Sequence, residues 1–191
     1  YEEGSATDLP QEVPKTWTQQ LYDDMLSVPV SYLKDAVMRQ MYDSEEIREV
    51  AFHPRPAAKG SSTLKRRMGV IDGEYPIMAV DGSGIECTIG YRLYPFRRRS
   101  APRPLVVYFH GNGENAADMD HMIGLYRSVG CSVLSVDFRG YGWSTGLPSL
   151  VTLTSDAAEL MTHLPNILQG AGLEGAPCIL MGRSLGSACA I

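Results

Sequence analysis

The residues with the clearest chemical potential are residues 182–186, Gly-Arg-Ser-Leu-Gly, which directly follow the apolar run 178–181. A serine hydroxyl can act as a nucleophile when a sharp turn from a strand into a helix holds it clear of the backbone. Such a turn strains the serine backbone, and side chains at the flanking glycine positions would collide across it. The pattern therefore predicts Ser184 as the nucleophile of an acyl-transfer reaction.

A second segment supplies the groups that this reaction needs at the developing oxyanion. Residues 110–113, His-Gly-Asn-Gly, directly follow the apolar run 105–109. One donor is expected to be the backbone N–H of Leu185, and the other the N–H of Asn112, or of Gly113 if the register differs. The glycines let the backbone approach a substrate.

A third segment, residues 137–146, completes a recognisable series. The segments HGNG, DFRGYGWSTG and GRSLGS, in this order and spacing, resemble the serine aminopeptidase-like branch of the α/β-hydrolase superfamily, which includes monoacylglycerol-lipase-like enzymes. The resemblance covers about residues 75–191. It implies hydrolysis of an ester, thioester or amide through an acyl-serine, with Ser184 as nucleophile and Asn112 and Leu185 as oxyanion donors. His110 and Gly111 would support the shape of the oxyanion loop.

The rest of the catalytic triad has no candidate at the expected place. In this fold the chain order is serine, then an acid, then histidine. Seven residues follow Ser184, and none of them is an acid or a histidine. Upstream, His110 belongs to the oxyanion loop, while Asp137 is expected to bond the turn that follows it. We therefore expect residues 1–191 alone to be essentially inactive, because loss of a triad member costs orders of magnitude in rate.

Two functional hypotheses follow from this pattern. The first is a serine hydrolase of which these residues form an incomplete part. The alternative is a non-catalytic, truncated hydrolase fold that binds a partner, with the amphipathic helices expected within residues 16–52 making the contacts. The intact nucleophile turn and oxyanion loop favour the first.

The elements needed to position these residues predict an α/β fold. From residue 105 onward, strand-like and helix-like segments alternate, which indicates a mostly parallel sheet with flanking helices. The fold expected is an α/β-hydrolase fold, incomplete because the strands after the nucleophile turn would be missing. Residues 1–69 would form an N-terminal helical extension and linker, and residues 70–191 the partial hydrolase domain.

The expected elements can be placed by their residue ranges. Strands are expected at 75–80, 85–94, 105–109, 131–136 and 179–181, with a hairpin turn at 81–84. Helices are expected at 116–129, at 150–164 with an interruption at Pro165, and from Leu185 onward. In the extension, apolar spacing predicts two short helices, around Trp17–Met25 and Leu33–Met41. A third is expected from Asp43 towards Val50, followed by a polar linker at 57–69.

Composition bounds the remaining possibilities. The chain of 191 residues is 44% hydrophobic and 20% charged, as in globular proteins. A net charge of −5 gives no reason to expect nucleic acid as a partner. The four cysteines form no CxxC motif, which favours buried reduced thiols. No apolar run approaches the roughly 18 residues of a transmembrane helix, and no secretory signal is present.

These features complete the expectations about partners. No cofactor is expected, because Gly111 and Gly113 lack the flanking motif of a phosphate site. No metal is expected either, since Glu114, Asp118 and Asp120 have the spacing of a solvated helix start. The expected partner is a small-molecule acyl substrate, with no transmembrane segment and a peripheral membrane contact left open. The expected location is cytoplasmic.

Overall fold

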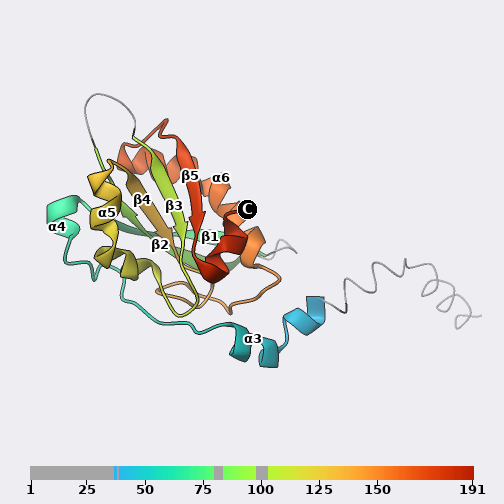
Figure 1. Ribbon diagram of the computed structural model, residues 1–191. Helices are drawn as coiled ribbons and strands as arrows, with labels where there is room; N and C mark the ends of the chain where they lie inside the picture. The colour runs from blue at the N-terminus through green and yellow to red at the C-terminus, as the bar shows by residue number, and fades with distance from the viewer. Residues whose placement is uncertain (1–36, 38, 80–83, 98–102) are drawn as a thin grey trace, which may run out of the picture. The chain divides into compact units, whose positions relative to one another are not determined.

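The computed structural model describes residues 37, 39–79, 84–97 and 103–191 (Figure 1). Residues 41–191 form one compact unit by their contacts. The helix expected around Trp17–Met25 lies outside the described residues, while residues 37 and 39–41 of the helix expected around Leu33–Met41 are described and are helical. Most of the expected turn at 81–84 also lies outside the described residues. The boundary between extension and domain at residue 69 stays a prediction.

A five-stranded sheet forms the centre of the unit, in the spatial order β1-β2-β4-β3-β5. Strands β3, β4 and β5 are parallel, which confirms the alternation read from residue 105 onward, while β2 pairs antiparallel with both β1 and β4. The bounds of the strands are β1 Ile71–Met78, β2 Ile85–Tyr94, β3 Leu105–Phe109, β4 Ser132–Val136 and β5 Cys178–Gly182.

Helices cover both faces of this sheet, as the alternation of side chains along β3 shows. Leu105, Val107 and Phe109 are buried in one hydrophobic cluster with the apolar face of α6 (Leu153–Ala171). Val106 and Tyr108 point the other way and pack with residues of the 3-10 helix η1 (Ala116–His121) and of α5 (Ile123–Ser128). Such a strand, buried on both faces, is typical of the centre of an α/β fold.

Two helices differ from the sequence expectation. The segment expected as one helix at 116–129 is divided into η1 and α5, which meet at Met122. The helix expected to be interrupted at Pro165 instead continues through it to Ala171. Proline removes one backbone hydrogen bond. The apolar face continues past it, because Leu164 and Leu168 are both buried, and that packing offsets the lost bond.

The segment before the sheet is more structured than a linker. Helix α3 spans Glu45–Ala51, and Ser44 rather than Asp43 caps it, accepting a hydrogen bond from the Ile47 N–H. Helix α4 spans Lys65–Met68, inside the segment expected as a polar linker, and its three basic residues are exposed. Phe52, directly after α3, is 4% exposed and belongs to the main core.

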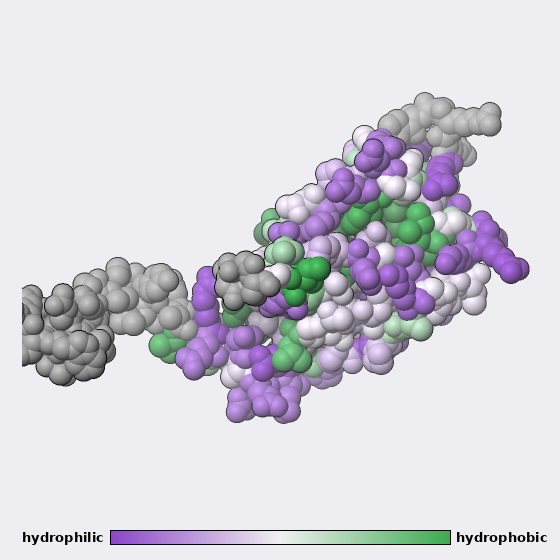
Figure 2. All heavy atoms as spheres, turned by 180° about the vertical axis from the view of Figure 1, so that it is seen from behind, coloured by the Kyte–Doolittle hydropathy of each residue, from purple (hydrophilic) through white to green (hydrophobic). Residues whose placement is uncertain are grey.

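Apolar side chains remain exposed in two kinds of place. Strand β5 lies at the edge of the sheet, and its residues Ile179, Leu180 and Met181 are 51%, 41% and 44% exposed. Figure 2 shows further hydrophobic patches among mainly polar side chains on the face hidden in Figure 1. The four cysteines are free, but only Cys87 is buried and Cys178 is exposed, so the expectation of buried thiols holds only in part.

Candidate active site

Ser184 lies in the turn between β5 and the 3-10 helix η2, which spans Ser184–Cys189. Its φ is +51°, and among the described residues it is the only non-glycine residue with a positive φ. This conformation is unfavourable for a residue with a Cβ and indicates local strain. The side chain is exposed at the carboxyl end of the sheet, as a nucleophile must be.

The two glycines that flank this turn are required by its geometry. A Cβ on Gly182 would lie 2.1 Å from the Gly186 carbonyl oxygen. A Cβ on Gly186 would lie 2.3 Å from the carbonyl oxygen of Phe109. Since both neighbours are backbone atoms, neither can move aside, and only glycine fits at either position.

The nucleophile turn and the loop at residues 110–113 lie against each other because their strands are neighbours. Phe109 of β3 pairs with Gly182 of β5, and the Arg183 N–H donates to the Phe109 carbonyl at 3.0 Å. A Cβ on Gly111 would come within 3.6 Å of the Arg183 carbonyl oxygen. Leu185 is the second residue of η2, where a backbone N–H has no partner inside the helix.

Glu114 joins these two segments through its side chain. One carboxylate oxygen accepts a hydrogen bond from the Gly111 N–H at 2.7 Å, and the other accepts one from the Arg183 guanidinium. Glu114 was expected at a solvated helix start and has instead a specific partner on each side. No local sequence pattern signals this contact, because Glu114 and Arg183 are 69 positions apart.

The other two acids of the expected helix start are also paired. Asp118 lies 3.0 Å from the Arg55 guanidinium and also accepts the Asn115 N–H. Asp120 accepts the Tyr94 hydroxyl at 2.5 Å. Within the described residues, no group of three potential ligands is arranged to hold a metal ion.

Asn112 is held in the loop by its side-chain amide. Its Oδ1 accepts from the Tyr141 hydroxyl at 2.7 Å and from the His53 N–H at 2.9 Å, and its Nδ2 donates to the Ala51 carbonyl at 2.9 Å. Tyr141 is fully buried, so it packs beneath the loop rather than lining an open acyl pocket. Burial raises the pKa of Tyr141, with the His53 N–H acting in the opposite direction, so the phenol keeps the proton that it donates to Asn112.

His110 is 1% exposed and lies inside the loop. Its Nδ1 donates to the Gly111 carbonyl at 2.9 Å, because a carbonyl can only accept. Its Nε2 lies 3.4 Å from Asp137 Oδ1, and that oxygen accepts the Ala116 N–H at 2.7 Å. Asp137 therefore bonds the start of η1 rather than the turn that follows it. The ring contacts Phe138 at a centroid distance of 4.4 Å, as expected of a side chain that shapes the loop.

None of the other three histidines, all in the described part of the chain, forms a hydrogen bond with Ser184. The His163 Nε2 lies 3.5 Å from Glu159 on the same helix, and its ring packs on Tyr75. His121 lines a separate polar pocket, and the backbone of His53 bonds Asn112. In the described part of the chain, the structure thus brings together the nucleophile turn and the oxyanion loop, without a histidine hydrogen-bonded to Ser184.

Comparison with known proteins identifies the family. The family model described as "Serine aminopeptidase, S33" matches residues 100–191. Lysophosphatidylserine lipase ABHD12 of Xenopus tropicalis is 34% identical over 94 residues, 48% of this chain and 23% of that protein. The chain belongs to the α/β-hydrolase superfamily.

Other members of the superfamily extend the match. The α/β-hydrolase domain-containing protein aho-3 of Caenorhabditis elegans is 28% identical over 160 residues, 76% of this chain and 46% of that protein. Each of these matches covers less than half of the relative's own length. Among solved structures, the Pyrococcus furiosus esterase Pf2001 is similar, with a TM-score of 0.49 and 17% identity over 72% of this chain and 51% of that one.

The described residues also bear on membrane attachment. Among them, no helix has both the length and the hydropathy that a membrane span requires.

Proposed function

We propose that this α/β-hydrolase cleaves a carboxylic ester, thioester or amide through an acyl-enzyme on Ser184. The observation that carries the proposal is the strained backbone of Ser184, held between two glycines that no other residue could replace. Strain of this kind persists only where the surrounding structure enforces it, and it occurs preferentially at active sites.

In the proposed reaction, Ser184 Oγ attacks the acyl carbonyl carbon and loses its proton to a general base. The carbonyl oxygen becomes an oxyanion, which the N–H groups of Leu185 and of Asn112 or Gly113 stabilise. The tetrahedral intermediate collapses to the acyl-serine as the protonated leaving group departs. Water then adds to the acyl-serine by the same route, which releases the acid and restores Ser184.

The general base and its orienting carboxylate are proposed to come from outside residues 1–191. In this superfamily both follow the serine along the chain, and residues 185–191 contain neither an acid nor a histidine. None of the four histidines within the chain forms a hydrogen bond with Ser184 in the structure. These residues would therefore hold the nucleophile and the oxyanion site, but not the complete triad.

For the substrate, we propose a small or lipid-like acyl ester. Support comes from the relatives, among which ABHD12 is named for lysophosphatidylserine lipase activity. The relatives share less than half of their length with this chain, so the acyl and headgroup preferences depend on residues outside the match.

The test uses a fluorophosphonate, which phosphonylates activated serines and needs no knowledge of the natural substrate. In the full-length protein, Ser184 is expected to be the labelled residue, identified by peptide mass spectrometry. Ser184→Ala should abolish both labelling and the hydrolysis of p-nitrophenyl esters. Ser187→Ala is the matched control, because this exposed serine lies three residues further along η2, and it should retain both.

Two outcomes separate the hypotheses. Retained esterase activity in Ser184→Ala would remove Ser184 from the mechanism. A full-length protein that neither labels nor hydrolyses any acyl ester would favour the non-catalytic binding protein instead. Residues 1–191 expressed alone should label at least 10³-fold more slowly than the full-length protein, as expected when a triad member is missing.

A further inference from the structure

The segment at residues 51–57, here called the strap, crosses the oxyanion loop. It lies outside the match to the family model, which begins at residue 100. It begins at Ala51, the last residue of α3, and is anchored at Phe52, which is buried in the main core. The strap is extended, and it approaches the catalytic edge of the sheet at two places.

The first contact is with the side chain of Asn112, and it is made by the backbone of the strap. Ala51 accepts the Asn112 Nδ2–H through its carbonyl oxygen, and His53 donates its N–H to Asn112 Oδ1, each at 2.9 Å. The Tyr141 hydroxyl closes the network, since it accepts the His53 N–H at 2.9 Å and donates to Asn112 Oδ1 at 2.7 Å. All the hydrogen-bonding atoms of the Asn112 amide group thus face the strap or Tyr141.

The second contact continues along the loop and its neighbour. Gly142 donates its N–H to the Arg55 carbonyl and accepts the Ala57 N–H, each at 2.9 Å, so that strap and turn pair like two strands. The Arg55 guanidinium donates to the Gly113 carbonyl at 2.9 Å.

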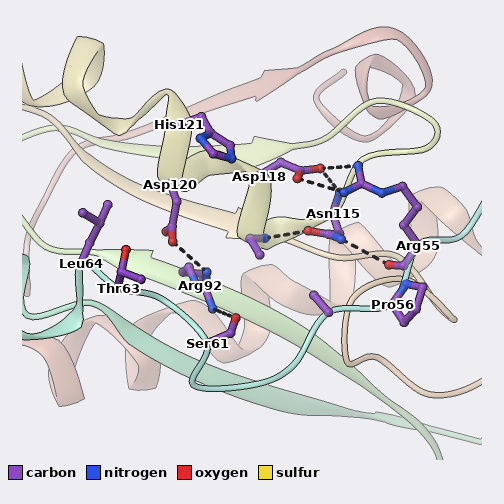
Figure 3. A pocket seen from close by; sticks show the side chains of 12 residues that line it. Arg55, Pro56, Ser61, Thr63, Leu64, Arg92, Asn115, Asp118, Asp120 and His121 are labelled. Atoms are coloured by element: carbon purple, nitrogen blue, oxygen red, sulfur yellow. Dashed lines mark hydrogen bonds and ion pairs between the residues drawn. The ribbon is translucent and has the colours of Figure 1, made fainter.

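Figure 3 shows the same guanidinium turned towards Asp118, and the amide of Asn115 directed to the Arg55 backbone. Through its bonds to Asn112 and Gly113, the strap therefore contacts both residues that could supply the second oxyanion donor.

We infer that the strap and Tyr141 position the oxyanion donor through the side chain of Asn112. An N–H stabilises an oxyanion only when it is fixed at the correct place before the reaction. A loop with two glycines is free to adopt other backbone conformations. The amide of Asn112 removes that freedom, because three hydrogen bonds to two separate segments fix its plane. This inference rests on the proposed serine-hydrolase function.

A positioning role for Tyr141 can be distinguished from a purely structural role by comparing two variants that each lose one buried hydroxyl. Tyr141→Phe removes only the hydroxyl and keeps the buried ring, so packing in the core is preserved. Tyr75→Phe is the matched control. Tyr75 is also buried, and its hydroxyl makes one hydrogen bond, 3.4 Å from the Asp156 carbonyl oxygen and away from the strap. Both variants lose one buried hydroxyl, but only Tyr141→Phe releases Asn112.

The experiment measures phosphonylation of Ser184 by a fluorophosphonate in the full-length protein, separated into kinact and KI. Removal of one oxyanion donor costs about 10²–10³ in rate, so partial release of that donor by Tyr141→Phe should lower kinact by about 10-fold. KI should stay within about 2-fold, since ground-state binding does not use the oxyanion site. Asn112→Ala should lower kinact by about 10- to 100-fold, and the double variant should be no slower than Asn112→Ala alone.

Tyr75→Phe should keep kinact within about 2-fold of the wild type. The inference is overturned if Tyr141→Phe lowers kinact no more than Tyr75→Phe, or if the effects of Tyr141→Phe and Asn112→Ala multiply. Amide hydrogen exchange gives a second readout that needs no catalysis: exchange at residues 111–113 should accelerate in Tyr141→Phe and not in Tyr75→Phe. If exchange accelerates only in Tyr141→Phe, but Ser184 of the wild-type protein is not labelled, the proposed function fails while the contact is supported. Equal exchange in the two variants rejects the strap as a positioning element.

Discussion

Glu114 and Arg183 connect the two halves of the candidate active site by a side-chain hydrogen bond. Glu114 belongs to the loop after β3, and Arg183 directly precedes the nucleophile. Because Glu114 also accepts the Gly111 N–H, one carboxylate fixes the oxyanion loop against the nucleophile turn. The Arg183 side chain is 60% exposed, so the pair should add little to stability, and its main effect is expected on geometry.

The first prediction concerns this pair. Glu114→Ala should lower the rate of Ser184 phosphonylation by about 10- to 100-fold, because a displacement of about 1 Å at a reacting group can cost that much. The free energy of unfolding should change by less than about 1 kcal/mol, as for an exposed ion pair. Glu159→Ala is the control, since the Glu159 side chain is 40% exposed on α6 and lies 3.5 Å from His163, away from the loop after β3. A loss of stability without a loss of rate would contradict the positioning role.

The second prediction concerns the glycines around Ser184. Gly186→Ala would bring a Cβ to 2.3 Å from the Phe109 carbonyl oxygen, so it should abolish labelling of Ser184 and destabilise the fold. Gly170→Ala is the matched control, because nothing lies within 4 Å of its Cβ and it lies in the last turn of α6. It should raise stability by up to about 0.5 kcal/mol through helix propensity, less than at a mid-helix position. Thermal unfolding would show opposite shifts, and a tolerated Gly186→Ala would refute the tight turn.

The third prediction concerns the buried ion pair between Arg92 and Asp72. Their side chains are 1% and 5% exposed, and the guanidinium makes two bonds to the carboxylate, at 2.6 and 3.0 Å. Arg92→Met should cost about 3–5 kcal/mol, because it leaves a buried carboxylate without its partner. Asp72→Leu combined with Arg92→Met should cost less than the sum of the two single changes. Urea unfolding of the four proteins measures this, and additive costs would contradict coupling between the two residues.

The sequence was sufficient for the parts of the site that are local in the chain. The turn at Ser184 and the loop at residues 110–113 each consist of consecutive residues, and the backbone geometry of each segment restricts which residue types can occupy it. The strands at 85–94 and 105–109 also have the predicted bounds. Apolar residues alternate with other residues along 85–94, and residues 105–109 are a continuous apolar run.

The contacts between distant segments could not be predicted in the same way. The bond between His53 and Asn112 spans 59 positions and is made by a backbone atom, so no residue type marks it. The strap at residues 51–57 therefore could not be recognised as part of the site. The interruption predicted at Pro165 was wrong for a related reason. Proline locally disfavours a helix, but burial of the neighbouring leucines keeps α6 intact.

The last prediction concerns the exposed edge of the sheet at β5. An edge strand with apolar side chains can pair with another chain, and Ile179 is 51% exposed on this strand. Residues 1–191 expressed alone should therefore self-associate, and Ile179→Lys should raise the monomer fraction, because a charge on an edge strand opposes pairing. Val129→Lys is the control, since Val129 is 71% exposed at the end of α5 and should not change association. Sedimentation velocity over a range of concentrations distinguishes the variants, and a monomeric wild-type chain throughout that range would show that β5 does not drive association.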